Sequence, residues 1–334
     1  MATKEKLLEL FETNKGTYFS GEEIAQTLGI SRTAVWKNVK ALQGEGYAIT
    51  AVTNKGYSLS EQTDILSPQG IQKYLNLNEA GKMVSNVKID FSPEIVVLPV
   101  TTSTNANVRE KAMEGATEGY TVIANEQTQG RGRRGRSFFA PAGTGIYMSI
   151  LLRPQNIRAE QAVCITTIAA VAVCEAIEAV SDEKAQIKWV NDVFVRGKKV
   201  CGILTEASLG MENGLLEYAI LGIGINVYRP EGGFGELETI AGAVLDAPKA
   251  DAKNKLAAEV MNSFMKYYSN MEQSEYVKEY QKRSLAIGRQ VNVLSGNDSR
   301  QAQVLSVDEE CRLHVRYEDG TEETLSSGEI SIRF

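Results

Sequence analysis

The segment from Gln161 to Val180 restricts the fold of this chain more than any other feature. It is too rich in alanine and too long for a strand, so we predict a largely buried helix. Its most apolar part, Ala162 to Val173, contains threonines and is too short to cross a bilayer. The 334 residues give ample length for a large core around such a helix, and they suit two or three domains.

Strand-like segments occur before and after this helix in the sequence. Three segments that follow it are separated by short polar turns, which favours antiparallel hairpins in a mixed sheet. Two more helices are expected next, and beyond Gly288 the sequence changes to short strand-like pieces typical of a small β-barrel. The expected strands of the central part are 95–100, 120–124, 187–190, 200–206 and 217–227, the helices are 251–271 and 274–283, and the barrel strands are 290–294, 301–307, 311–317 and 329–333.

The segment from Gly21 to Lys40 has the pattern of a helix-turn-helix motif. Small and branched apolar residues mark one face of each helix, and Gly29 permits the bend between them. Ser31 is positioned to cap the second helix, 31–43. Two strand-like segments, 47–52 and 56–59, then form a short hairpin that looks like a wing.

Positive charge is concentrated on the second of these helices, which has no acidic residue. The whole chain has a net charge of −6, which argues against a general nucleic-acid coat, so we expect any DNA contact to be local. The alternative is a small three-helix interaction domain that never meets DNA. We expect Trp36 and Tyr57 to lie in the core of this domain, and a position flanking DNA is the alternative. The candidate DNA-binding residues are Ser31, Arg32, Thr33, Lys37, Lys40 and the wing residue Lys55.

The segment Gly130–Arg136 places four arginines among three glycines. Glycines let the backbone approach a ligand closely, and guanidinium groups bind carboxylate or phosphate oxygens in pairs. The pattern therefore predicts a phosphate-binding loop, and the strand that ends at Ile150 anchors the loop to a sheet. A solvated basic loop and a nucleic-acid patch are the alternatives that this segment alone leaves open.

Other features exclude several classes of site. The charged N-terminus does not resemble a secretory signal, so we expect a cytoplasmic protein without a membrane partner. The sequence has no complete dinucleotide fingerprint and no P-loop, and its only histidine, His314, lies in the expected barrel. The cysteines lack paired spacing and sit in apolar surroundings, which favours buried free thiols over a disulfide framework or a zinc site: Cys164, Cys174, Cys201 and Cys311.

Five further segments follow in a characteristic order: 102–105, 125–129, 187–192, 198–206 and 221–226. At these residues and at the arginine loop the chain resembles the bacterial biotin–protein ligases, specifically the bifunctional class that also represses the biotin operon. The resemblance covers essentially the whole chain. It implies an α+β protein with three domains: a winged helix-turn-helix at 1–62, a mixed-sheet catalytic domain of the biotin/lipoate ligase type at 63–284, and an SH3-like barrel at 285–334.

The resemblance also implies residue roles. Lys199, Arg133 and Asp192 are the candidate catalytic residues; Asp192 would position the acceptor lysine or a magnesium ion, and an ordinary turn residue is the alternative. Phe138 stands where related sequences have tryptophan, and Val190 where they have proline. The candidate biotin-binding residues are Ser103, Thr104, Asn105, Gln127, Gly130, Arg131, Gly132, Arg133, Lys199, Gly202, Leu204 and Gly222, and those for ATP or the adenylate are Arg133, Arg134, Arg136, Phe138, Asn191 and Asn226.

The expected activity follows from this resemblance. The protein would activate biotin with MgATP to biotinyl-5'-AMP, transfer biotin to a lysine of a biotin carrier domain, and bind operator DNA as an adenylate-bound homodimer. No permanently bound cofactor is implied. Two alternatives stay open: a biotin-responsive regulator that has lost transfer, and a lipoate-type ligase.

Overall fold

The computed structural model describes residues 2–84, 91–210, 214–295, 298–326 and 328–332. The chain forms two compact units. We call residues 1–75 with 247–258 the N-terminal unit, and residues 76–246 with 259–334 the main unit.

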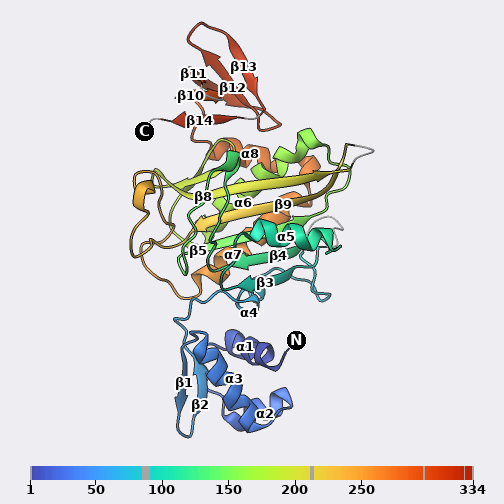
Figure 1. Ribbon diagram of the computed structural model, residues 1–334, viewed down its shortest axis with the longest axis vertical. Coiled ribbons are helices and arrows are strands. Elements are labelled where there is room, and N and C mark those ends of the chain that lie inside the picture. Colours follow the sequence, from blue (N-terminus) through green and yellow to red (C-terminus); the bar gives the residue numbers. More distant parts are fainter. Residues whose placement is uncertain (1, 85–90, 211–213, 296–297, 327, 333–334) are drawn as a thin grey trace. The chain divides into compact units, whose positions relative to one another are not determined.

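The N-terminal unit contains a winged helix-turn-helix (Figure 1). A capping box starts its second helix: the Glu23 backbone N–H donates to Ser20 Oγ over 3.1 Å, and the Ser20 N–H donates to the Glu23 carboxylate over 2.7 Å. Gly29, with φ of 66°, ends that helix in the left-handed region. The elements are α1 (Thr3–Thr13), α2 (Gly21–Leu28), α3 (Arg32–Gly44), β1 (Ile49–Val52), β2 (Gly56–Leu59) and α4 (Pro68–Gln72).

The expected helix-turn-helix and wing are confirmed, but one expected core residue is not. Val35 and Val39 of α3 point into the core with Leu42, whereas Trp36 is 51% exposed. The expectation for Trp36 was wrong because the residue after Val35 lies outside the apolar face of the helix. Tyr57 is partly buried and packs against the core.

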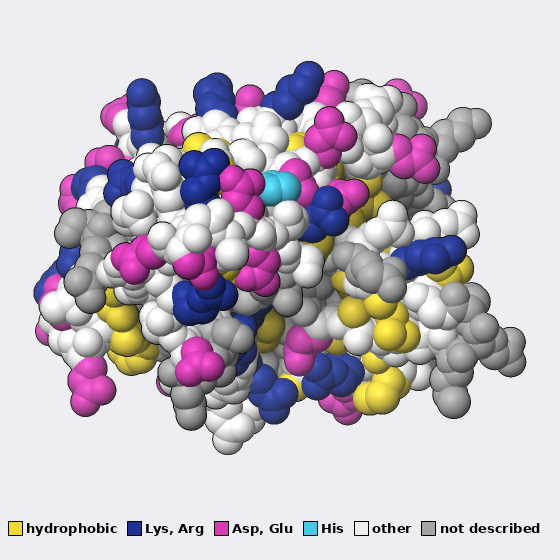
Figure 2. All heavy atoms as spheres, turned by 90° about the horizontal axis from the view of Figure 1, so that it is seen from above, with side chains coloured by type: hydrophobic (Ala, Val, Ile, Leu, Met, Phe, Trp, Pro, Cys, Tyr) yellow, Lys and Arg dark blue, Asp and Glu magenta, His cyan; other side chains and the backbone are white. Residues whose placement is uncertain are grey.

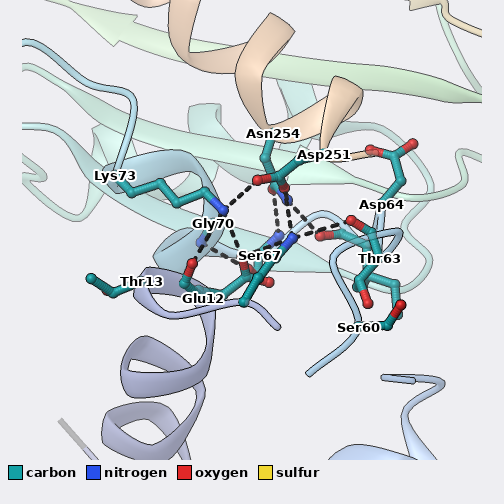
Figure 3. Close-up of polar contacts among 12 residues, drawn as sticks. Glu12, Thr13, Ser60, Thr63, Asp64, Ser67, Gly70, Lys73, Asp251 and Asn254 are labelled. Carbon is teal, nitrogen blue, oxygen red and sulfur yellow. Dashed lines mark hydrogen bonds and ion pairs between the residues drawn. The ribbon is translucent and has the colours of Figure 1, made fainter. Parts of the chain in front are cut away.

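A buried group of charges, which we call the ionic cluster, joins the end of α1 to later parts of the N-terminal unit (Figure 3). Lys73 Nζ lies 3.0 Å from Glu12 Oε2 and also pairs with Asp251. Lys15 Nζ lies 3.1 Å from the Glu12 carboxylate and 3.0 Å from Asp251 Oδ1. The Glu12 side chain is 1% exposed, so two cations and two carboxylates neutralise each other away from water.

Asn254, on α7 (Ala252–Tyr268), completes the connections around this cluster. Its side chain accepts from the Ser67 N–H at 3.1 Å, and donates to Asp251 Oδ1 at 2.9 Å and the Ile65 carbonyl at 2.8 Å. Burial alone raises the pKa of Asp251, but hydrogen bonds, led by that from Lys73, hold it below its usual value. The chain after the wing and the first turns of α7 therefore belong to the same compact unit as the winged helix.

A seven-stranded mixed sheet forms the centre of the main unit, in the order β3-β4-β5-β9-β8-β7-β6. The β3–β4 pair is parallel and the other pairs are antiparallel. The expected hairpins are confirmed, although β7 was not anticipated. The strands are β3 (Glu94–Leu98), β4 (Tyr120–Ala124), β5 (Gly145–Leu152), β6 (Ala185–Lys188), β7 (Asp192–Val195), β8 (Lys198–Leu209) and β9 (Leu216–Asn226).

Helices cover both faces of this sheet (Figure 1). On one face, Val108 and Ala112 of α5 (Thr104–Met113) pack against Val122, Leu151 and Ile220. The other face carries α6 (Val163–Val180), which also packs against α8 (Glu275–Arg283). By length and composition α6 resembles a membrane span, but most of its residues are buried in the protein. The expected buried helix is confirmed.

The C-terminal part of the main unit is a five-stranded antiparallel sheet in the order β13-β12-β11-β10-β14. The last strand pairs with the first, so the described end of the chain returns to the start of this domain. Residue 333 of the expected last strand lies outside the described residues, and β13 was not anticipated. Figure 2 shows positive and negative side chains interspersed over one face of the molecule. The strands are β10 (Gln290–Ser295), β11 (Asp298–Val307), β12 (Leu313–Tyr317), β13 (Glu322–Leu325) and β14 (Glu329–Ile332).

Candidate functional site

A cavity of about 130 Å³ in the main unit brings most of the candidate residues together. Segments distant in the sequence line it: the start of α5, the arginine loop, the neighbouring strands β7, β8 and β9, and the start of β14. The candidate residues that line it are Ser103, Thr104, Asn105, Gln127, Arg131, Gly132, Arg133, Arg134, Arg136, Phe138, Asn191, Asp192, Lys199, Gly202, Leu204 and Gly222.

Part of the cavity lining belongs to a network of neutral hydrogen-bonding groups. The Thr104 N–H and hydroxyl donate to Gln127 Oε1 at 2.9 and 3.1 Å. The Ser149 hydroxyl lies 2.7 Å from Thr104 Oγ1 and 2.6 Å from Asn105 Oδ1. Because the Gln127 oxygen accepts both bonds, its amide nitrogen is left to donate to another group. This network suits a small ring with its own carbonyl and N–H groups.

Cations form another part of the cavity lining. Six basic side chains and two carboxylates line the cavity, so its lining has an excess of positive charge. The two carboxylates are those of Asp192 and Glu329; the basic residues are Arg131, Arg133, Arg134, Arg136, Lys188 and Lys199. Such an excess favours an anionic ligand.

The arginine loop is folded back on itself. The Gly132 N–H donates to the Arg136 carbonyl over 2.7 Å, and Arg134 adopts the left-handed region with φ of 56°. Arg136 makes a bidentate pair with Glu329 of β14, at 2.6 and 2.9 Å. Arg133 Nη1 donates to Asn191 Oδ1 over 3.0 Å. The terminal domain therefore supplies a carboxylate to the loop.

Lys199 and Asp192 meet on adjacent strands. Lys199 Nζ lies 2.7 Å from Asp192 Oδ1, at the start of β8 and β7 respectively. Burial lowers the pKa of Lys188 although Asp192 opposes it, and burial together with Arg134 lowers the pKa of Arg133. Both effects indicate cations held in a partly desolvated space, where a ligand anion interacts more strongly than in water.

The glycines of β8 and β9 make room for side chains above the sheet. A Cβ atom on Gly224 would come within 2.6 Å of the Phe138 ring, and one on Gly202 within 3.3 Å. A Cβ on Gly222 would overlap the Asn105 amide, with Cγ only 3.0 Å away. Gly202 and Gly224 are opposite each other in the register, so the ring covers a bare patch of sheet.

Two candidate residues do not line the cavity. Gly130 accepts a hydrogen bond from the Phe138 N–H, and a Cβ there would overlap the Phe138 carbonyl. Asn226 donates to the Gly242 carbonyl over 3.1 Å.

Sequence reasoning also missed several lining residues. Gly224 had a signal, since it alternates with Gly222 on one face of a strand, and Lys188 lies within the 187–192 segment that carries the resemblance, whereas Glu329 had no signal.

The N-terminal unit presents the other candidate surface. Arg32, Lys37 and Lys40 are exposed on α3, and Ser31 caps this helix by accepting from the Ala34 N–H over 3.2 Å. The wing residue Lys55 lies over the Tyr18 ring, 5.8 Å from its centroid. Trp36 adds a large apolar side chain to the exposed surface of this helix.

Metal and thiol chemistry have little support here. Within the described ranges, no group of three or more His, Cys, Asp or Glu residues is placed to hold a metal ion. The four cysteines are free, as expected, and burial raises the pKa of Cys164 to about 11 and that of Cys311 to about 12.

Three family models match this chain. The biotin/lipoate A/B protein ligase family matches residues 97–226, a helix-turn-helix domain matches 3–58, and the biotin protein ligase C-terminal domain matches 286–333. These ranges contain the mixed sheet with most of the cavity, the winged helix and the terminal sheet respectively.

Individual relatives agree with these models. The chain is 33% identical over 330 residues to the bifunctional ligase/repressor BirA of Bacillus spizizenii, with 97% of each chain covered. It is 37% identical over 245 residues to the bifunctional ligase/repressor BirA of Bacillus subtilis, with 73% of this chain and 71% of the relative covered. The solved biotin protein ligase from Aquifex aeolicus in complex with biotin and ATP matches with a TM-score of 0.58 and 26% identity, over 72% of this chain and 98% of that chain. The chain therefore belongs to the family of bifunctional biotin–protein ligases and repressors.

Proposed function

We propose that this protein activates biotin with MgATP to biotinyl-5'-AMP, transfers biotin to a lysine of a biotin carrier domain, and represses biotin genes as an adenylate-bound dimer. One observation supports the enzymatic part most directly. A single cavity is lined by both neutral hydrogen-bonding side chains and cations, and biotin has a ureido ring at one end and a carboxylate at the other. The proposal places the ring against Ser103, Thr104, Asn105 and Gln127.

The first step joins two anions. A biotin carboxylate oxygen attacks the α-phosphorus of ATP, a C–O–P linkage forms, and the bond to the departing pyrophosphate breaks. Cations must neutralise both reactants and the charge that develops between them. We assign this role to Arg131, Arg133 and Lys199. Arg134 and Arg136 would bind phosphate oxygens, and Phe138 would stack on adenine with Asn191 and Asn226 nearby.

The second step is acyl transfer. The neutral amine of the carrier lysine attacks the biotinyl carbonyl carbon, an amide forms, AMP leaves, and the amine loses a proton to solvent or a nearby base. Asp192 is already 2.7 Å from Lys199, so we assign it first to orienting that cation. Magnesium would enter as part of MgATP, because Mg²⁺ is usually held by substrate phosphates together with one or two carboxylates.

The repressor function is assigned to the winged helix. The exposed cations of α3 and Lys55 of the wing would contact phosphates and base edges of an operator, and a homodimer would place two such helices on a two-fold site. A cytoplasmic location belongs to the same proposal, because the operator DNA and the carrier domain would both be met there. We retain the domains 1–62, 63–284 and 285–334 as proposed functional boundaries, although the N-terminal compact unit also takes in residues 63–75 and 247–258.

The test uses the full-length protein with labelled biotin, MgATP and a purified carrier domain. We expect stable label on one carrier lysine, and none when ATP is omitted. Labelled adenylate without labelled carrier would support a regulator that has lost transfer, and labelling by lipoate in place of biotin would support a lipoate-type ligase. An operator mobility-shift assay tests DNA binding. A protein that lacks the residues before Glu61 is expected to lose operator binding and keep ligation.

A further inference from the structure

The Asn105 amide contacts a charged pair that does not line the cavity. Its Nδ2 donates to Glu206 Oε2 over 2.7 Å, and Arg109 Nη2 lies 2.6 Å from the other carboxylate oxygen, Oε1. Glu206 follows the lining residue Leu204 by two positions on β8, so both side chains point to the same side of the sheet. Arg109 follows Asn105 by four positions on α5, which places them on the same face of that helix.

The chemistry of the pair permits one amide orientation. An ionised carboxylate only accepts hydrogen bonds, so the amide nitrogen of Asn105 must face Glu206. The amide oxygen then faces Ser149, whose hydroxyl lies 2.6 Å away on β5. Gly222 leaves the space for the amide on β9, where a Cβ would overlap it. Three adjacent strands therefore hold this amide, and Asn105 is almost fully buried.

We propose that Glu206, held by Arg109, is a positioning residue that fixes which way the Asn105 amide presents its donor and acceptor to the ligand ring. The identity of the ring as the ureido group of biotin rests on the proposed function. A ureido ring has one acceptor and two donors in fixed places, so a reversed amide would set donor against donor or acceptor against acceptor. The pair thus contributes to selectivity for the ring without touching it.

The proposal makes an unusual prediction for Glu206→Gln. Glutamine has one acceptor oxygen, and the guanidinium of Arg109, which can only donate, would take it. The glutamine nitrogen then faces Asn105, whose amide must rotate to accept from it. Removing Arg109 as well, in Arg109→Met with Glu206→Gln, frees the glutamine oxygen to turn to Asn105 and restores the original orientation.

The experiment measures biotin binding by calorimetry and the KM for biotin, the KM for MgATP and kcat for adenylation. We expect Glu206→Gln to weaken biotin binding about tenfold or more, with kcat at saturating biotin and the KM for MgATP within about threefold of wild type. The double variant should recover most of the lost affinity. Glu217→Gln is the matched control, because Glu217 is an exposed glutamate on β9 that hydrogen-bonds Ser208, and it should change nothing.

Two outcomes would overturn the proposal. Biotin affinity of Glu206→Gln within about twofold of wild type would show that the pair does not orient Asn105. A loss of biotin affinity that the double variant does not recover would show that Glu206 acts through its negative charge and not by orienting the Asn105 amide. Should Glu206→Gln not fold, Ser149→Ala tests the opposite side of the same amide: weaker biotin binding with an unchanged KM for MgATP supports the proposal, and unchanged biotin binding opposes it. Wild-type protein that does not bind biotin would instead contradict the proposed function.

Discussion

The two dense groups of charge in this protein differ in how their charges are neutralised. The ionic cluster of the N-terminal unit matches two lysines with two carboxylates, and its Glu12 side chain is almost completely buried. The cavity of the main unit has six basic side chains and two carboxylates, and Arg136 remains 65% exposed although it pairs with Glu329. The first group is complete without a ligand. The second has an excess of positive charge. Such an excess distinguishes a site for a phosphate-bearing substrate from a structural ion pair.

The largest effect is expected from a substitution that removes a cation from the cavity. Lys199→Ala should leave the fold intact and lower biotin adenylation by about two to three orders of magnitude, the scale for losing one preorganised charge stabiliser. Biotin binding should change much less, because the residues proposed to hold the ring are untouched. Single-turnover formation of biotinyl-adenylate measures the effect. Lys184→Ala, at an exposed position before β6, is the control, and a near-normal rate for Lys199→Ala would remove this lysine from the mechanism.

The matching change in the ionic cluster should affect stability and not chemistry. Glu12→Gln keeps the shape of the side chain but leaves Lys15 and Lys73 facing one carboxylate. We expect the free energy of unfolding of the N-terminal unit to fall by about 3 kcal/mol, the lower end for breaking a buried ion pair. Hydrogen exchange of α1 peptides measures this, with Glu9→Gln, on the same helix and exposed, as control. If Glu12→Gln lost adenylation while hydrogen-exchange protection in α1 stayed unchanged, the assignment of stability to the ionic cluster and of chemistry to the cavity would be contradicted.

A ligand that neutralises the cationic cavity should also strengthen operator binding. The adenylate supplies a phosphate that neutralises the arginine loop and orders its glycine-rich backbone. If the ordered form dimerises better, two winged helices are paired for a two-fold operator and DNA affinity rises by linkage. We expect both self-association and operator binding to strengthen by about 1 to 3 kcal/mol. Sedimentation equilibrium with a non-hydrolysable adenylate measures the first; tighter DNA binding with an unchanged dimer constant would indicate a change within a preformed dimer.

The contrast between the two groups also explains what the sequence revealed. The arginine loop and the Ser103–Asn105 segment were predictable because their chemistry is concentrated in short contiguous motifs. Glu329 and the partners of the ionic cluster were not, since Glu12 and Asp251 meet only through the tertiary fold. Strand β13 was missed because three of its four residues are exposed, and β7 was missed because its three buried residues follow one another without alternation. For Trp36 the signal existed: Val35, Val39 and Leu42 define the buried face of α3, and residue 36 lies off it.

The last and smallest prediction is a pH dependence of stability that arises from the ionic cluster. The pKa of Asp251 is held below its usual 3.8 in the folded protein. Its contribution to stability is therefore fully present above the unfolded value and is lost as the pH falls through the folded value. The pKa of Lys73 is raised above 10.5, because Asp251 and Glu12 outweigh the opposing effect of burial, so its contribution is present below 10.5 and is lost only at higher pH.

Asp251→Asn removes the acidic part of this profile. Burial and Asp251 raise the pKa of the neighbouring Tyr74 to about 12, so this tyrosine stays neutral throughout the acidic range. We would measure urea unfolding of the full chain between pH 6 and pH 3 and monitor it by hydrogen exchange of α1 peptides. The free energy of unfolding should fall less steeply with decreasing pH for Asp251→Asn than for wild type. Equal slopes would mean that Asp251 is not preferentially ionised in the folded state, and the cluster would then stabilise the unit by packing and neutral hydrogen bonds alone.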